Sequence, residues 1–216
     1  MQPLLKKHYT AIRKLFFDYG IASITMDDIA ISLHISKKTI YREYVCKNDL
    51  VKDLFMSDYQ QFRTYINSLD DKDMDAIAKT IHLYDITLKK IFLINASVLY
   101  DLRKYFPSLL DELTILHREL LQKSVASVLL KGKADKFFHN EIMIDSIAQL
   151  FTFLFESYVF SRISGIQEDF IPNRNDFLDY HFRSVCSPSG LKKWETLKKK
   201  DLVVENPFNE CHFISK

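Results

Sequence analysis

Turn-forming residues are scarce in this sequence, whose 216 residues include only four glycines and five prolines. β-Sheets need many tight turns, and tight turns usually need Gly, Pro, Asn or Asp. Long helices with few connections need far fewer such residues. The scarcity therefore predicts an all-α fold.

Cysteines and long apolar runs are also lacking. Cys46, Cys186 and Cys211 are far apart and form no Cys-x-x-Cys pair, so neither a disulfide framework nor a zinc site is expected. No stretch reaches the roughly 18 uncharged apolar residues that cross a bilayer, and the first residues lack the apolar core of a signal peptide. The sequence therefore predicts a reduced, cytoplasmic protein with no membrane partner, metal or cofactor.

The chain has no large excess of positive or negative charge: its net charge is only +2 at pH 7. Within residues 1–50, eight Lys and Arg face five Asp and Glu, so the remainder is slightly acidic. By itself, so mild an asymmetry is typical of a solvated surface.

The sequence does contain helical periodicity, with apolar residues three and four positions apart along most of its length. Three short helices are expected first, followed by several longer ones. Residues 191–216, a lysine-rich segment and a mixed tail, receive no assignment. The predicted helices cover residues 4–19, 26–33, 37–44, 47–66, 74–95, 96–104, 109–130, 141–164 and 173–185.

The second and third predicted helices fit a helix-turn-helix. Thr25 and Ser36 stand at positions that favour N-caps, and Ile40 and Tyr44 share one face of the third helix. A single helix fits the major groove of B-DNA, where its exposed side chains meet base edges and phosphates. Lysines suit phosphates, and the forked guanidinium of Arg42 suits a guanine.

Three ordered motifs carry a family resemblance: Ala11-x-x-x-Leu15-Phe16-x-x-Tyr19-Gly20, Thr25-Met26-x-Asp28-Ile29-Ala30 and Ile35-Ser36-Lys37-Lys38-Thr39-Ile40-Tyr41-x-x-Tyr44. Followed by Lys47 and Asp49-Leu50, they resemble the DNA-binding domain of the TetR family over about a quarter of the chain. The resemblance implies a homodimeric transcriptional regulator, by family default a repressor, that a small molecule releases from a pseudo-palindromic operator in double-stranded DNA. The implied domains are a helix-turn-helix domain over 1–48, a helical ligand-binding and dimerisation domain over 49–190, and a tail over 191–216.

The resemblance also implies roles by position. Thr25 would cap the second helix and contact a phosphate, and Lys47 would contact a phosphate at the start of the fourth helix. Positions 38 and 42 would vary with the operator. The expected DNA-binding residues are Thr25, Ser36, Lys37, Lys38, Thr39, Tyr41, Arg42 and Lys47.

Three positions depart from the family pattern. Leu33-His34-Ile35 replaces the usual Ala-Gly-Val, and because His accepts a positive φ better than most residues, a strained turn is expected there. Lys38 replaces a small residue and adds a charge at the groove. Cys46 replaces the serine that usually caps the fourth helix. It is either a neutral substitution or a redox sensor, and the absence of a partner cysteine favours the first.

The helix predicted over 141–164 is apolar on nearly all sides, so every face must be buried. It is either enclosed within one subunit, or it packs one face on its own subunit and the other on a partner. The second arrangement, with the helix over 175–185, resembles the four-helix dimer interface of the family.

A pocket for a small apolar or amphipathic effector is expected among the helices over 47–66, 74–95, 109–130 and 141–164. Each candidate residue is alternatively an ordinary member of the core. The candidates are His82, Tyr84, Phe92, Asn95, His117, Gln149, Phe151 and Phe155.

Other classes of function find less support. An enzyme is not expected, because the chain has no Gly-rich phosphate loop, no His-Glu-x-x-His and no Gly-x-Ser-x-Gly. Two alternatives stay open: a DNA-binding regulator without a ligand, and a helical protein-interaction module. The module would have no sequence-specific DNA affinity and would not respond to changes at Lys38 or Arg42.

Overall fold

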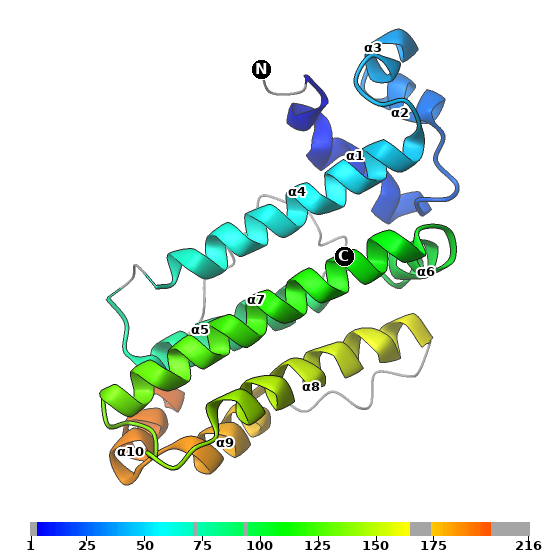
Figure 1. The fold of residues 1–216 in the computed structure, drawn as a ribbon. Helices are drawn as coiled ribbons and strands as arrows, with labels where there is room; N and C mark the ends of the chain where they lie inside the picture. Colours follow the sequence, from blue (N-terminus) through cyan, green and yellow to red (C-terminus); the bar gives the residue numbers. More distant parts are fainter. Residues whose placement is uncertain (1–3, 71–72, 93–94, 165–173, 200–216) are drawn as a thin grey trace. The chain divides into compact units, whose positions relative to one another are not determined.

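The computed structural model describes residues 4–70, 73–92, 95–164 and 174–199, and in these ranges every regular element is a helix (Figure 1). One isolated antiparallel bridge joins Phe138 and Cys186. The predicted all-α fold is confirmed. Within the described part of the chain, no helix is both long enough and apolar enough to cross a membrane.

The chain divides into two compact units. Of the described residues, unit 1 takes 4–62, 92 and 95–115, and unit 2 takes 63–70, 73–91, 116–164 and 174–199. Two long helices, α4 (Lys47–Ser68) and α7 (Pro107–Ala134), contribute residues to both units. The predicted domain limits at residues 48 and 190 stay predictions.

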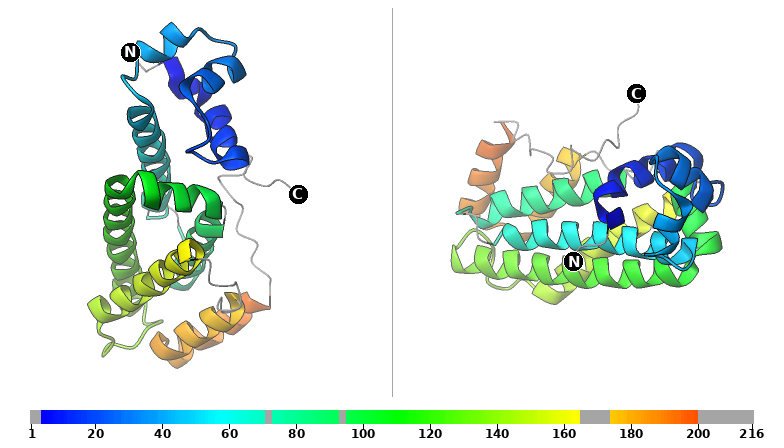
Figure 2. Two further views of the ribbon diagram at one scale, coloured as in Figure 1. Left: turned by 90° about the vertical axis from the view of Figure 1, so that its right-hand side faces the viewer. Right: turned by 90° about the horizontal axis from the view of Figure 1, so that it is seen from above.

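Unit 1 opens with a 3₁₀ turn, η1 (Leu4–His8), and three helices, α1 (Tyr9–Tyr19), α2 (Met26–Ser32) and α3 (Lys37–Tyr41). Figure 2 shows these helices from two further directions. Their apolar faces and the first half of α4 form one core, because each helix is too short to be stable without packing. The buried side chains of this core include Leu5, Ile12, Phe16, Ile29, Ile40, Leu50 and Leu54.

Helix α3 is shorter than the sequence predicts, ending at Tyr41 instead of Tyr44. The amides of Glu43 and Tyr44 both donate to the carbonyl of Ile40, at 3.0 Å each. This bifurcated turn tightens the end of the helix. Tyr44 is buried, and side-chain contacts from outside the helix fix it there.

Unit 2 contains α5 (Ala76–Phe92) as far as Ile91, α8 (Ile144–Ser164) and α9 (Arg174–Val185), together with the second half of α7. Aromatic rings join three of these helices. Tyr84 of α5 stacks on Phe177 of α9 with 4.6 Å between ring centroids, and Phe151 and Phe155 of α8 surround the pair. Such contacts add to the stabilisation that burial provides.

A further helix, α10 (Pro188–Lys198), covers part of the segment that the sequence left unassigned. Ser187 caps it and Pro188 starts it, so the Ser-Pro-Ser-Gly segment that ends α9 also begins α10. Trp194 is buried against Phe182, and its indole N–H donates to Asp179 at 3.0 Å. Hydrogen bonds from Arg183 and Trp194 lower the pKa of Asp179 to about 2.

Gly132 of α7 is required by the packing of unit 2. A Cβ at this position would lie 2.0 Å from Cδ2 of Phe138, a ring that is itself buried. We expect Gly132→Ala to lower the free energy of unfolding by about 1–3 kcal/mol, the usual cost of overpacking. Urea unfolding followed by circular dichroism measures this, with the exposed neighbour Lys131→Ala as control. Equal stability of the two variants would contradict the packing.

Candidate DNA-binding surface

Helix α2 is fixed at its start by a capping box. The Thr25 hydroxyl accepts from the amide of Asp28 at 3.1 Å, and the Asp28 carboxylate accepts from the amide of Thr25 at 2.8 Å. These bonds satisfy backbone N–H groups that have no partner within the helix at its N-terminus. The hydroxyl and the amide of Thr25 both donate to the Asp28 carboxylate, and these two hydrogen bonds lower the pKa of Asp28. The predicted cap is confirmed, whereas the contact between Thr25 and a phosphate stays a prediction.

The turn between α2 and α3 contains a strained residue. His34 has a φ of +53°, in the left-handed region where the family's usual glycine meets no steric penalty. The amide of Ile35 then donates to the carbonyl of Ala30 at 3.1 Å and closes the turn. The sequence prediction of a strained turn is confirmed.

Helix α3 presents a polar face while one apolar side chain holds it down. Ser36 caps the helix by accepting from the amide of Thr39 at 3.1 Å, and Ile40 is fully buried. Of the eight predicted DNA-binding residues, Thr39 and Lys47 are half-buried. The six exposed ones are Thr25, Ser36, Lys37, Lys38, Tyr41 and Arg42.

A hydrogen-bonded network beneath α3 was not expected from the sequence. The hydroxyl of Tyr44 donates to Asp53 of α4 at 2.6 Å, and the hydroxyl of Tyr9 of α1 donates to the same oxygen at 2.5 Å. Burial and the hydrogen bonds to Asp53 raise the pKa of both tyrosines, so both stay neutral. The network ties the end of the third helix to α1 and α4. Three residues so far apart in sequence give no local signal.

Lys47 makes contacts within the protein. Its ammonium donates to the carbonyls of Ile21 and Ala22, the second at 3.3 Å. Burial lowers the pKa of Lys47, while Asp101 and Asp28 act in the opposite direction. This lysine therefore holds the segment between α1 and α2. Its predicted phosphate contact stays a prediction.

Helix α6 (Ala96–Tyr105) reaches the same segment from elsewhere in unit 1. Asp101 accepts from the amide of Ala22 at 2.8 Å. Asn95 caps α6 by accepting from the amide of Ser97, and its amide group donates to the carbonyl of Phe17 at 2.9 Å. Two polar side chains thus join α6 to the helix-turn-helix, which the sequence alone did not indicate.

Cys46 occupies the capping position before α4. Its amide and its thiol each donate to Asp49 at 3.3 Å. The other described cysteine, Cys186, is buried, and burial raises the pKa of its thiol to about 12. These contacts are consistent with a neutral substitution at position 46.

The structure brings three of the eight predicted pocket residues together, because Tyr84, Phe151 and Phe155 share the aromatic cluster of unit 2. His82 and His117 are half-buried and Gln149 is exposed, all in unit 2. Asn95 belongs to unit 1, where it caps α6. The side chain of Phe92 lies outside the described residues. His181 joins the cluster unpredicted, and burial lowers its pKa to about 4.

A family model supports this view of the N-terminal helices. The model described as "Bacterial regulatory proteins, tetR family" matches residues 9–54. A comparison with curated protein sequences gives no match.

Three solved structures with a similar fold are distant in sequence from this chain. Reduced NemR of E. coli is 12% identical with a TM-score of 0.64, over 85% of this chain and 98% of that one. FadR of Bacillus halodurans, a fatty acid degradation regulator, is 15% identical with a TM-score of 0.59, over 85% and 94%. CprB of Streptomyces coelicolor, in complex with its operator, is 17% identical with a TM-score of 0.58, over 93% and 98%.

The strain at His34 can be measured. We expect His34→Gly to raise the free energy of unfolding by about 0.5–1 kcal/mol, because glycine adopts a positive φ without the Cβ clash. Urea unfolding measures the change. The matched control is Ser32→Gly, the last residue of α2 and also exposed, where glycine should be destabilising by a similar amount. Equal losses in both variants would show that His34 is not strained.

Proposed function

We propose that this chain, whose residues 9–54 match the family model of bacterial TetR regulators, is a dimeric repressor that a small molecule releases from its operator. The observation that carries the proposal is the exposed polar face of α3. This helix combines a capped start, a buried anchor in Ile40 and exposed Lys38, Tyr41 and Arg42.

The exposed side chains of α3 suit two tasks in DNA binding. Ser36, Lys37, Thr39 and Tyr41 would contact backbone phosphates and set the orientation of the helix in the major groove. Lys38 and Arg42 would read base edges, since a guanidinium can donate two hydrogen bonds to one guanine. CprB, with a similar fold, has been solved with its operator, which supports duplex DNA as the partner.

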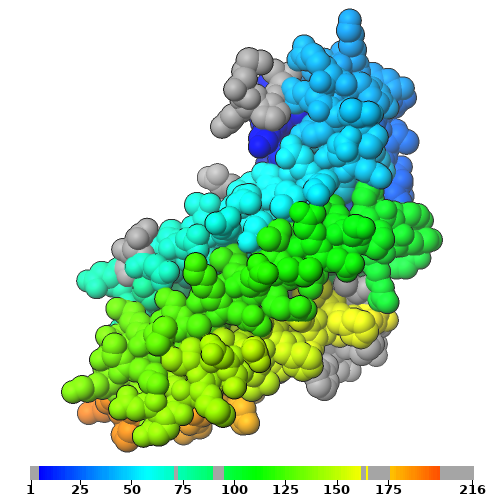
Figure 3. Space-filling view, viewed as in Figure 1, coloured from blue at the N-terminus to red at the C-terminus, as the bar shows by residue number. Residues whose placement is uncertain are grey.

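Dimerisation is supported by the outer face of α8. Phe151 and Phe155 of this helix are buried within unit 2, whereas Leu150, Phe153 and Phe160 are 58–63% exposed. The exposed positions are three and seven residues apart, so they share one face of the helix. Figure 3 shows side chains of α8, in yellow, on an open face beside α7, in green. Burying this face against a second copy removes it from water.

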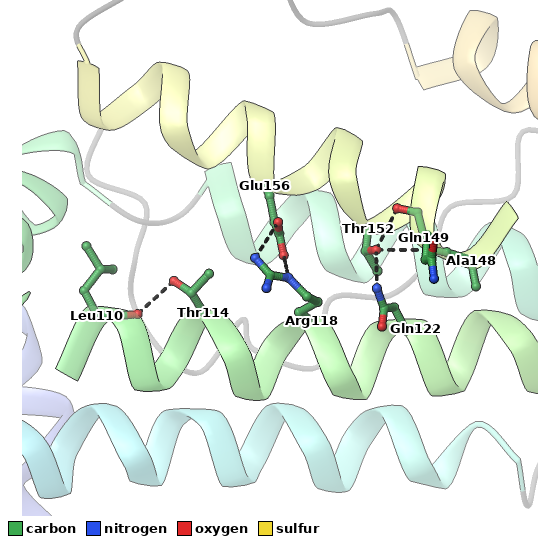
Figure 4. Close-up of polar contacts among 8 residues, drawn as sticks. All are labelled: Leu110, Thr114, Arg118, Gln122, Ala148, Gln149, Thr152 and Glu156. Atoms are coloured by element: carbon green, nitrogen blue, oxygen red, sulfur yellow. Dashed lines mark hydrogen bonds and ion pairs between the residues drawn. The ribbon is translucent and has the colours of Figure 1, made fainter. Parts of the chain in front are cut away.

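Polar contacts fix how α8 rotates about its axis. Arg118 of α7 donates to both carboxylate oxygens of Glu156, at 2.5 and 2.9 Å, and Gln122 donates to Thr152 at 3.4 Å (Figure 4). Both pairs lie in unit 2 and hold one face of α8 toward α7. Successive residues of a helix differ by about 100° around its axis, so Phe153, which follows Thr152, points away from the contact with α7.

A dimer also meets a geometric requirement of the operator. Two recognition helices must reach successive major grooves about 34–36 Å apart, which a two-fold axis provides on a pseudo-palindrome. An effector that favours another spacing would weaken DNA binding, and such coupling is typically worth about 1–3 kcal/mol.

The effector site is proposed around the aromatic cluster of unit 2. Tyr84, Phe151 and Phe155 supply apolar and polarisable surface, and the neutral imidazole of His181 adds a polar group within it. This composition suits a small apolar or amphipathic molecule. Of the other predicted candidates, His82, His117 and Gln149 also belong to unit 2 and keep this role as a proposal.

Sequence reading by α3 is tested with Arg42→Ala. We expect this change to weaken binding to the DNA upstream of the protein's own gene by about 1–3 kcal/mol, because one bidentate base contact is lost. Fluorescence anisotropy near physiological salt, with competitor DNA, measures it. The matched control is Arg103→Ala, which removes an exposed arginine from α6 of the same unit.

Tight wild-type binding that withstands competitor and is lost only in Arg42→Ala supports a sequence-reading repressor, and effectors are then screened by release from that operator. Weak, salt-dependent binding that is equal in all three proteins indicates phosphate contact without readout. No DNA binding at all would favour the protein-interaction module, and tight binding that no effector releases would favour a regulator without a ligand.

The dimer face is tested with Phe153→Asp. We expect sedimentation velocity to show a monomer, because a charge at the centre of an apolar interface loses its hydration without gaining a partner. Tyr105→Asp, at another exposed aromatic residue, in unit 1, is the control and should leave the dimer intact. A dimeric Phe153→Asp variant with unchanged helix content would exclude this face.

A further inference from the structure

Lys37 pairs with an acidic residue on the neighbouring helix. Its ammonium nitrogen lies 2.6 Å from each carboxylate oxygen of Asp27, and both side chains are just over half exposed. Lys37 is the first residue of α3 and Asp27 the second of α2, so the pair spans the helix-turn-helix. The hydrogen bond to Asp27 raises the pKa of Lys37, so its ammonium stays charged.

Asp27 is not needed for the fold of this motif. The capping box of α2 uses the neighbouring Asp28, whose carboxylate accepts from both the amide and the hydroxyl of Thr25. The side chain of Asp27 adds only a favourable charge in the first turn of α2. The two adjacent acids therefore have different roles: Asp28 caps α2, whereas Asp27 pairs with Lys37.

A phosphate and Asp27 compete for the same ammonium. Exposed ion pairs are weak, so a duplex can displace the carboxylate. The displaced carboxylate then stays near the negatively charged backbone of the DNA. We propose that Asp27 is an intramolecular competitor of DNA, which lowers the affinity of Lys37 for backbone phosphates. The inference rests on the proposed function, because it takes α3 as the DNA-binding helix.

This competition lowers affinity for all DNA and leaves specificity unchanged. Phosphate contacts are independent of sequence, so Asp27 weakens binding to operator and to other DNA by similar factors. Because random sites greatly outnumber operators in a genome, the carboxylate shortens the time that the regulator spends on unrelated DNA. The ratio of the two affinities still depends on the residues that read bases.

The competition is tested with Asp27→Asn on a duplex of mixed sequence, which needs no knowledge of the operator. We expect about three- to tenfold tighter binding at low salt, from the loss of the ion pair and of the repulsion. The slope of log K against log salt should steepen by up to about 0.9, equivalent to one added phosphate contact. Asp27→Ser should act in the same direction, and circular dichroism confirms folding of both variants.

The matched control is Asp18→Asn. It removes the same charge from a similar exposed pair, Lys14–Asp18 at 2.7 Å, near the end of α1 that contacts α6. A second control combines Asp27→Asn with Lys37→Met. If Asp27 acts through Lys37, its removal in that background should change affinity no more than Asp18→Asn does.

The outcomes separate the inference from the proposed function. Greater tightening by Asp27→Asn than by Asp18→Asn, lost in the Lys37→Met background, supports the competitor. Equal tightening by the two asparagine variants, or a gain that persists without Lys37, would overturn it. If the wild-type protein binds no duplex at all, the proposed function fails, whereas wild-type binding with no effect at position 27 refutes only the inference.

Discussion

A helix of five residues has no stability of its own, so the position of α3 depends on how its inner side is held. Ile40 is fully buried in the core of unit 1. Tyr44, just beyond the helix, shares the carboxylate of Asp53 with Tyr9. Burial fixes the depth of α3, and directional hydrogen bonds fix its rotation, since apolar contacts alone allow slippage. The exposed face that meets DNA in the proposed function follows from these constraints.

Hydrogen bonds also fix the geometry of the segment between α1 and α2. Gly20 adopts a φ of +84° and lies against Asp101, whose carboxylate accepts from the amide of Ala22. The Lys47 ammonium donates to two backbone carbonyls of the same segment. Buried polar groups are costly unless satisfied, and when satisfied they favour one geometry over its neighbours. Helices α4 and α6 thereby set the path of the chain into the helix-turn-helix.

Unit 2 is held together in another way, by rings that pack from three helices. Tyr84 stacks on Phe177, and Phe151 contacts Phe155 and His181. Helix α8 carries this aromatic cluster on one face and an exposed apolar stripe on the other. Helix α8 is apolar on nearly all sides. This composition is explained if a second copy of the chain covers its outer face.

The sequence by itself determined the all-α class and the helix-turn-helix, because caps and apolar periodicity are local signals. Thr25 and Ser36 cap as expected, and His34 adopts the predicted positive φ. Only the tertiary structure decided which polar groups meet: Asp53 with two tyrosines, Lys47 with two carbonyls and Asp27 with Lys37. It also decided that α10 forms and where α3 ends. Such pairings join residues up to 44 positions apart, and no local pattern encodes them since packing alone brings them together.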